Sequence, residues 1–138
     1  MGGLIELISD IRKYLEEILG LKGSTVLFQN AGRELGKEIG ETLREERIDR
    51  YLEKVGEFMR ESKVGILIPE EVSQNRIILS IDECITCSGM RSIGRRICHF
   101  ETGIVAGLLE TFLNRRVKVQ ETKCNAMGEG ICQVTVEV

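Results

Sequence analysis

Long apolar runs, a large excess of charge and a leader-like start are all missing from this sequence of 138 residues. A bilayer span needs about 18 consecutive apolar residues, and no run approaches that length. Met1–Ile5 lacks the basic and apolar regions of a secretory signal peptide. The formal net charge of -3 gives no chain-wide attraction to phosphate backbones, and the basic clusters within 91–96 and 115–118 are short. We therefore expect a cytoplasmic protein with no membrane span and no nucleic-acid partner.

Tryptophan is also absent, and His99 is the only histidine. No Ser-His-Asp or Cys-His system can be identified around this histidine. No glycine-rich nucleotide loop lies between a predicted strand and a predicted helix. The motifs therefore give little support to enzyme chemistry.

Cysteine is well represented, with five residues. An odd number in a reducing compartment argues against a disulfide framework, which leaves metal ligation, reactivity or simple burial. Hydrophobic residues make up 42% of the chain and charged residues 30%, which suits a soluble globular protein. The length is that of one domain with its own core.

The first half of the chain has the apolar spacing of helices. Apolar residues recur at helical intervals over Leu4–Leu19, and Gly20 closes this predicted amphipathic helix. Two more helices are predicted over residues 30–46 and 48–58. Helices therefore come first in this chain.

Three glycines follow one another at four-residue intervals in the second predicted helix: Gly32, Gly36 and Gly40. Each costs about 1 kcal/mol relative to alanine inside a helix. The close approach of another backbone or of a ligand would account for such a stripe.

After residue 63 the pattern predicts two hairpins with a helix between them. Val64–Ile68 is a short apolar run stopped by Pro69, and residues 77–81 alternate, as strands do. The second hairpin is predicted from alternation over 116–121 and 131–138, around a turn.

Residues 100–113 return to helical spacing, with Ile104, Leu108 and Phe112 on one face. The order of elements predicts an α+β fold, in which N-terminal helices pack on an antiparallel sheet of about four strands. We expect one domain, with a helical part over 1–62 and the sheet, the long helix and a metal site over 63–138.

The last hairpin places polar groups on its apolar face. Alternation directs Glu121 to the same side as Val117 and Val119, and it directs Cys132 inward on the final strand. A carboxylate on the inner face, opposite a thiol on the partner strand, is costly to bury unless it is paired or bound to a cation. A metal ion would resolve this conflict.

Two more thiols complete a candidate metal site. Cys124 follows Glu121 by three residues, and Cys98 leads into the long helix. Three thiolates and one carboxylate suit tetrahedral zinc, and a full shell implies a structural ion. Simple burial of the cysteines remains an alternative, and three thiolates with an imidazole such as that of His99 would be the more usual shell.

Residues 83–138 resemble the 4-vinyl reductase domain family. The motifs that carry the resemblance are Cys98–Gly103, Ala106–Gly107, Val117–Cys124 and Ala126–Gly128 before Cys132. The resemblance implies helices on an antiparallel sheet around an apolar pocket, a fold shared with haem-based nitric-oxide sensors and Golgi-transport tethering subunits. In the similar zinc-bearing aromatic sensors, the equivalent positions bind zinc, which here are Cys98, Glu121, Cys124 and Cys132.

The chain departs from the phenol-responsive members, which use a His and a Trp in the pocket. We therefore do not expect phenol specificity. The leading hypothesis is a non-enzymatic domain that binds or senses an apolar small molecule, contains a structural zinc, forms a homodimer and reports binding to a partner protein. A tetrapyrrole vinyl reductase or its accessory subunit is the alternative, and a protein-assembly module is the third interpretation. Core or pocket-wall positions are expected for Ile77, Leu79, Phe100, Leu108 and Phe112.

Cys84 and Cys87 form a C-x-x-C pair outside this predicted zinc site. The pair allows redox chemistry, a second half-site or alternative metal ligands. Without a thioredoxin-like context, the preferred interpretation is a packed turn that lines the pocket. The sequence assigns no role to either residue.

Overall fold

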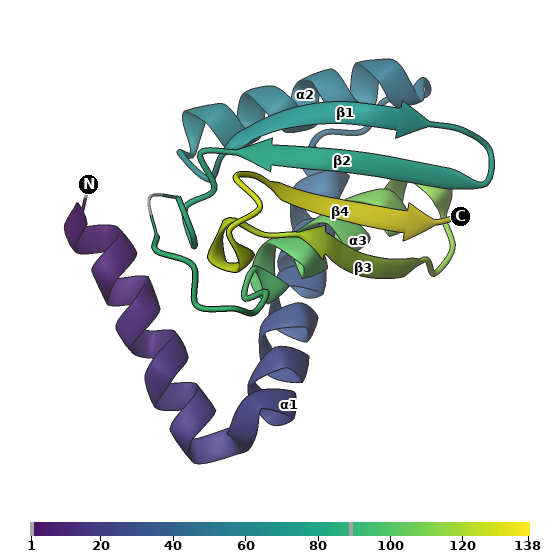
Figure 1. The fold of residues 1–138 in the computed structure, drawn as a ribbon. Coiled ribbons are helices and arrows are strands. Elements are labelled where there is room, and N and C mark those ends of the chain that lie inside the picture. Colours follow the sequence, from purple (N-terminus) through teal and green to yellow (C-terminus); the bar gives the residue numbers. More distant parts are fainter. Residues whose placement is uncertain (1, 89) are drawn as a thin grey trace.

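The computed structural model describes residues 2–88 and 90–138, with side chains from Glu6 onward. Gly89 and the side chain of Leu4, which belongs to the predicted amphipathic helix, lie outside the described residues. The described residues form α1 (Gly2–Thr42), α2 (Ile48–Glu61), β1 (Ile66–Val72), β2 (Arg76–Asp82), α3 (His99–Leu113), β3 (Lys118–Lys123), the short η1 (Asn125–Met127) and β4 (Cys132–Glu137). The second half of α1 and α3 lie behind the sheet, and α2 runs beside β1 (Figure 1). The predicted α+β class is confirmed. Over the described residues, no helix has both the length and the apolar character needed to cross a membrane.

The sheet joins two antiparallel hairpins through their second strands. β1 pairs with β2, β3 pairs with β4, and β2 pairs with β4, which gives the order β1-β2-β4-β3. Both predicted hairpins are confirmed. The predicted stop at Pro69 is wrong, because β1 continues to Val72 with a register shift between Pro69 and Glu71. Proline donates no backbone hydrogen bond, and β1 tolerates it as an edge strand.

Helix α1 is bent at Gly20 into two arms that form a V (Figure 1). Gly20 has φ 74° and ψ 170°, a conformation that residues with a Cβ rarely adopt. The interruption predicted at Gly20 is therefore present. Residues 21–29, which the sequence left unassigned, are also helical and extend the second arm.

The second arm of α1 and α3 approach each other backbone to backbone. A Cβ added to any of four glycines would lie closer to the opposite carbonyl oxygen than real Cβ contacts allow. The glycine and carbonyl pairs are Gly32 with Phe100, Gly36 with Ile104, Gly103 with Gln29, and Gly107 with Arg33. Close approach of another backbone is therefore confirmed for Gly32 and Gly36 of the predicted glycine stripe, whereas Gly40 faces the side chains of Tyr51 and Thr111.

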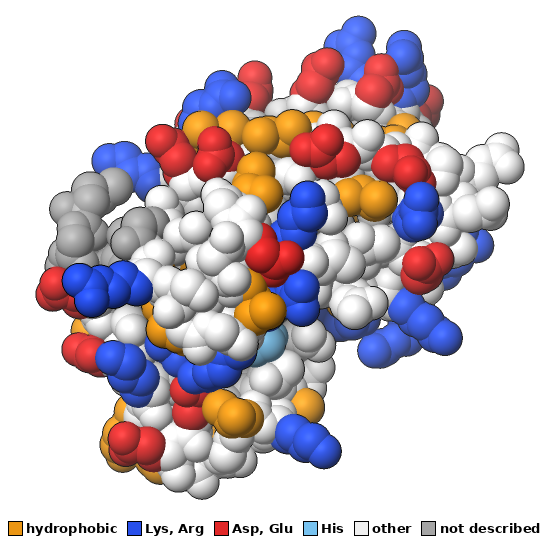
Figure 2. Space-filling model, in the orientation of Figure 1, with side chains coloured by type: hydrophobic (Ala, Val, Ile, Leu, Met, Phe, Trp, Pro, Cys, Tyr) orange, Lys and Arg blue, Asp and Glu red, His pale blue; other side chains and the backbone are white. Residues whose placement is uncertain are grey.

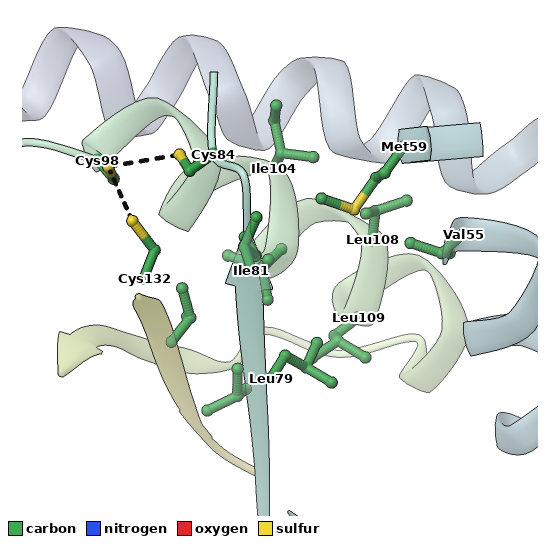
Figure 3. Packing of buried hydrophobic residues seen from close by; sticks show 14 of the residues in the cluster. Val55, Met59, Leu79, Ile81, Cys84, Cys98, Ile104, Leu108, Leu109 and Cys132 are labelled. Carbon is green, nitrogen blue, oxygen red and sulfur yellow. Dashed lines mark hydrogen bonds between the residues drawn. The ribbon is translucent and has the colours of Figure 1, made fainter. Parts of the chain in front are cut away.

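Helix α3 is buried on every side from Glu101 to Glu110, because it lies between α1 and the sheet. The prediction of a single apolar face was therefore too narrow. Leu108 and Leu109 pack in the same cluster as Leu79 and Ile81 of β2 (Figure 3). This packing fixes the first turn of α3 next to the ends of β2 and β4.

Candidate metal centre and adjoining cavity

The four residues predicted to bind metal are all buried, and Cys98 lies in contact with the other three. Cys98 is the N-terminal cap of α3, Glu121 lies in β3, Cys124 precedes η1, and Cys132 begins β4. The Cys98 Sγ lies 3.7 Å from the Cys124 Sγ and 3.3 Å from the Cys132 Sγ. The Cys98 backbone N–H donates to Glu121 Oε1 at 3.2 Å.

The strand register differs from the prediction. Glu121 pairs with Val134 across β3 and β4, whereas Cys132 pairs with Ile81 of β2, so Glu121 and Cys132 are not directly opposite each other. Ligand atoms of Cys98, Glu121 and Cys124 all lie within 4.8 Å of one another, while Cys132 belongs to a second such group. The predicted inward orientation of Glu121 and Cys132 holds, because both are buried.

The second group consists of Cys84, Cys87, Cys98 and Cys132. The Cys98 Sγ lies 3.6 Å from the Cys84 Sγ and 3.3 Å from the Cys87 Sγ, and the Cys87 and Cys132 sulfurs are 2.9 Å apart. Figure 3 shows Cys98 between Cys84 and Cys132, to which dashed lines join it. Cys84 and Cys87 are therefore members of the cluster that the sequence did not assign.

The turn after β2 directs both of these thiols inward. The Cys87 N–H donates to the Cys84 carbonyl at 3.3 Å, which closes a tight turn. The Asn125 side-chain amide donates to the Cys87 carbonyl at 2.7 Å and joins this turn to the loop before β4. The C-x-x-C spacing was the signal that could have identified the pair.

The carboxylate and the thiols of the cluster lie so close together that ionisation of one disfavours ionisation of the others. Burial and the neighbouring Cys124 raise the pKa of Glu121 to about 9. The pKa of Cys124 is raised by its hydrogen bond with Cys132 but lowered more by those with Cys87 and Cys98, to about 6. Hydrogen bonds from Cys124 and Cys84 lower the pKa of Cys132 to about 5. A bound cation would relieve this competition.

These residues fit zinc by donor type. A zinc–sulfur distance of about 2.3 Å in a tetrahedral shell separates two sulfurs by about 3.8 Å, which the Cys98–Cys84 and Cys98–Cys124 separations of 3.6 and 3.7 Å approach. The Cys98 sulfur lies closer to those of Cys87 and Cys132, at 3.3 Å. Glu121 Oε2 is buried and has no hydrogen-bond partner among the described residues, which leaves it available to a cation. His99 belongs to neither group of candidate ligands; its Nδ1 lies 3.8 Å from Glu121 Oε2.

A largely apolar cavity of about 500 Å³ adjoins the cysteine cluster. Its lining comes from both arms of α1, the loops around 85–86 and 97, the start of α3 and Val64, and it comprises Ile8, Ile11, Arg12, Leu27, Phe28, Ala31, Val64, Ile85, Thr86, Ile97, Phe100 and Glu101. Glu101 connects the cavity to the cluster, because its Oε2 accepts a hydrogen bond from the Cys84 thiol at 2.8 Å. Burial raises the pKa of Glu101.

The five residues expected in the core or in the pocket wall have different positions in the structure. Phe100 lines the cavity, whereas Ile77, Leu79 and Leu108 are core residues. Phe112 packs on Tyr51 instead, with ring centroids 5.0 Å apart. In the C-x-x-C turn, the two intervening residues line the cavity, while the thiols join the cluster.

Known proteins match this chain in sequence as well as in shape. The sequence pattern of the 4-vinyl reductase domain matches residues 77–138, which include all five cysteines and Glu121. The uncharacterised protein MJ1642 of Methanocaldococcus jannaschii is 31% identical over 129 residues, which cover 94% of this chain and 71% of that protein. This chain belongs to the 4-vinyl reductase domain family. The resemblance predicted from the sequence is thus confirmed.

A second relative from the same organism, the uncharacterised protein MJ0150, is 34% identical over 116 residues. The matched region covers 84% of this chain and 66% of MJ0150. The chain therefore spans about two thirds of the length of these relatives.

Solved structures share the fold of this 4-vinyl reductase domain. The phenol-responsive sensory domain of the transcription activator PoxR, determined with phenol, has a TM-score of 0.80 at 18% identity and covers 97% of this chain and 73% of that one. A vinyl-4-reductase family protein from Methanocaldococcus jannaschii has a TM-score of 0.58 at 25% identity and covers 80% and 68%. Subunit 3 of a trafficking protein particle complex from Naegleria fowleri, covalently bound to palmitic acid, has a TM-score of 0.69 at 13% identity and covers 98% and 94%.

Proposed function

We propose that residues 1–138 act as one 4-vinyl reductase domain that binds or senses an apolar small molecule. The observation that carries this proposal is the cavity of about 500 Å³ between the arms of α1, the start of α3 and the C-x-x-C turn. Small-molecule pockets commonly have volumes of about 300–1,000 Å³ and apolar walls. The PoxR sensory domain has the same fold and responds to phenol, which supports a sensing role for this architecture.

The polar atoms of the cavity narrow the chemistry of the ligand. Arg12 is 5% exposed and Glu101 is 1% exposed. Arg12 Nε and Glu101 Oε1 have no hydrogen-bond partner among the described residues. Buried polar atoms usually have partners, so a mainly apolar ligand with one or two polar groups fits this lining better than a pure hydrocarbon.

Filling the cavity tests this proposal. Ala31 lines the cavity, so Ala31→Trp should weaken binding of the apolar dye Nile red by at least about tenfold. Val26→Trp is the matched control, because Val26 lies on the same arm of α1, is 57% exposed and is not part of the lining. Fluorescence titration measures both. Equal dye affinity in the two variants would contradict binding in this cavity, and organic extraction with mass spectrometry would identify any retained ligand.

We further propose that Cys98, Glu121, Cys124 and Cys132 hold a structural zinc. A full protein shell leaves no position for a reactive water, so the ion would contribute to folding rather than to catalysis. Elemental analysis of the purified chain should find zinc, and Cys124→Ser should lower both the zinc content and the unfolding midpoint. Lys123→Ser, a change of the exposed neighbouring residue, should alter neither. A chain prepared without chelators that contains no zinc would refute the site.

Homodimer formation through α1 is also proposed. Large apolar side chains are exposed along this helix, including Leu7, Ile11, Tyr14, Ile18, Leu19 and Leu21. In Figure 2, apolar side chains also reach the surface at the lower end of the molecule, where the arms of α1 meet. Clustered apolar exposure is typical of an interaction surface, and a second copy or a partner protein would cover it. Light scattering should give a dimer mass for the full chain, and a monomer mass at all concentrations would exclude the dimer.

The compartment follows from the chemistry of the proposed zinc site. Thiols bind metal only while they remain reduced, and the cytoplasm keeps them so. We therefore propose that this protein is cytoplasmic.

A further inference from the structure

The cysteine cluster contains more donors than one zinc ion can use. Five thiols and the Glu121 carboxylate lie in one buried region, whereas a structural zinc site has four ligands. If Cys98, Glu121, Cys124 and Cys132 bind the proposed ion, then Cys84 and Cys87 are left over. Both are among the most buried residues of the chain, at 2% and 0% exposure.

The spacing of the sulfurs gives Cys98 a central position. Its Sγ lies between 3.3 and 3.7 Å from the sulfurs of all four other cysteines. One tetrahedral ion gives each ligand three neighbours, so four close sulfur neighbours together with Glu121 exceed a single shell. A thiolate shared between two ions has ligands of both ions around it, which is the environment of Cys98.

We propose that the cluster binds two zinc ions, with Cys98 and Cys132 as bridging thiolates. This inference rests on the proposed first site, in which Cys98, Glu121, Cys124 and Cys132 surround one ion. The second ion would be held by Cys84, Cys87, Cys98 and Cys132, the four cysteines whose sulfurs lie within 4.8 Å of one another. Two tetrahedral ions need eight coordination bonds, and six residues supply eight when two thiolates each bind both ions.

The charges of the buried cluster favour two ions over one. Five thiolates and one carboxylate carry six negative charges in a region where every contributing residue is at most 7% exposed. One zinc ion would leave four of these charges uncompensated or require thiols to keep their protons. Two zinc ions leave two, so the second ion reduces the cost of burying the ligands.

Neighbouring side chains form hydrogen bonds that would orient the ligands of the second ion. Cys84 Sγ lies 2.8 Å from Glu101 Oε2, so a zinc-bound Cys84 thiolate would accept a hydrogen bond from a protonated Glu101 carboxyl group, and the Cys87 carbonyl accepts a hydrogen bond from the Asn125 amide. Contacts of this kind orient ligand residues around metal ions. Sulfur separations of 2.9 to 3.7 Å are too short to admit inorganic sulfide between the cysteines, which disfavours an iron–sulfur centre. They are also shorter than the roughly 3.8 Å between two sulfurs of a tetrahedral zinc site, so the Cys87 and Cys132 sulfurs would move apart by about 1 Å when the second ion binds.

Metal stoichiometry of the full chain tests the proposal. The chain is loaded with Zn²⁺ under reducing conditions, freed of excess metal and measured by native mass spectrometry and elemental analysis. We expect two zinc ions per chain, and one in the Cys84→Ser/Cys87→Ser double variant. Ser88→Ala, a change of a non-ligand residue beside the same turn, is the matched control and should retain two.

Titration with Co²⁺ provides a second measurement that is sensitive to thiolate ligation. Thiolate-to-cobalt absorption should saturate at two equivalents in the native chain and at one in the double variant. A single ion in the native chain would overturn the two-ion proposal. If that ion survives in the double variant, the proposed structural zinc at Cys98, Glu121, Cys124 and Cys132 stands. If that ion is lost, Cys84 and Cys87 hold it and the proposed structural site is overturned as well. No bound metal at all would overturn both proposals, so the two failures are distinguishable.

Discussion

Replacing Gly36 by alanine should destabilise this protein, although alanine is the better helix former. Gly36 lies in the second arm of α1 and faces the backbone of α3. A Cβ at this position would lie 3.0 Å from the Ile104 carbonyl carbon and 3.0 Å from the Leu108 nitrogen, and closer still to the Ile104 carbonyl oxygen. These are backbone atoms, so no side-chain rotation can relieve the clash.

The expected magnitude follows from two opposing effects. Overpacking a well-packed core costs about 1–3 kcal/mol, and a rigid backbone neighbour places this site at the upper end, about 3 kcal/mol. Removing a glycine from a helix interior returns about 1 kcal/mol. The net loss should be about 2 kcal/mol, which corresponds to a decrease in Tm of roughly 7 °C for a domain of this size.

The matched control is Gly56→Ala in α2. A Cβ at Gly56 would meet only the Leu67 Cβ, at 3.9 Å, which is ordinary van der Waals contact. This variant should therefore gain about 1 kcal/mol from helix propensity. Urea unfolding followed by far-UV circular dichroism measures both free energies. A Gly36→Ala variant as stable as Gly56→Ala would refute the proposed close packing of α1 on α3.

Other perturbations have expected outcomes that stability measurements can check. Glu110→Gln removes the charge paired with Arg33 Nη1 at 2.5 Å and should cost about 3 kcal/mol, whereas Glu41→Gln, in an exposed pair, should change little. Tyr51→Phe loses a hydrogen bond of 2.6 Å to the Leu108 carbonyl and should cost about 1 kcal/mol. Burial raises the pKa of Tyr51 from 10.0 to about 12, so the contribution of the neutral hydroxyl to stability is complete below pH 10 and is lost as the pH rises toward 12. The unfolding midpoint of the native chain should therefore fall between pH 10 and pH 12, and this part of the fall should be absent in Tyr51→Phe. Chelation of the proposed zinc, or acidification that protonates its ligands, should lower Tm, and a Tm unaffected by chelator in a zinc-containing sample would contradict a structural role.

Much of the fold follows from local periodicity. Alternation identifies β2 and β4, because Ile77, Leu79 and Ile81 on one strand and Cys132, Val134 and Val136 on the other face the core. Periodicity cannot show that β2 and β4 pair, since that contact joins two separate hairpins. It also fails for residues 21–29, where exposed Leu21, Val26 and Leu27 leave no polar face to contrast with an apolar one.

The candidate site was predictable where its residues lie on regular strands. The alternation of β3 and β4 directs Glu121 and Cys132 inward, and both are buried. Cys84 and Cys87 lie in a turn, where no period relates sequence position to direction. Their burial depends on tertiary contacts such as the Asn125 amide on the Cys87 carbonyl, which one sequence does not reveal.

The first turn of α3 connects the proposed metal site to the proposed ligand site. Cys98 caps this helix, Thr102 Oγ1 donates to the Cys98 carbonyl at 2.7 Å, and Phe100 and Glu101 between them line the cavity. An ion that fixes Cys98 therefore also fixes part of the cavity wall.

The opposite wall of the cavity comes from the first arm of α1, which joins the second arm at the Gly20 bend. The Arg95 guanidinium pairs with both carboxylate oxygens of Glu16, at 2.7 and 2.8 Å, and so ties the first arm to the loop that leads to Cys98. A ligand that displaced the first arm at the Gly20 bend would have to break this ion pair.

The first arm also carries exposed Leu7, Ile11 and Tyr14, so the cavity wall and the proposed interaction surface belong to the same helical arm. Glu16→Gln, which weakens the pair with Arg95, should therefore alter both dye binding and the dimer mass if the position of this arm matters to both.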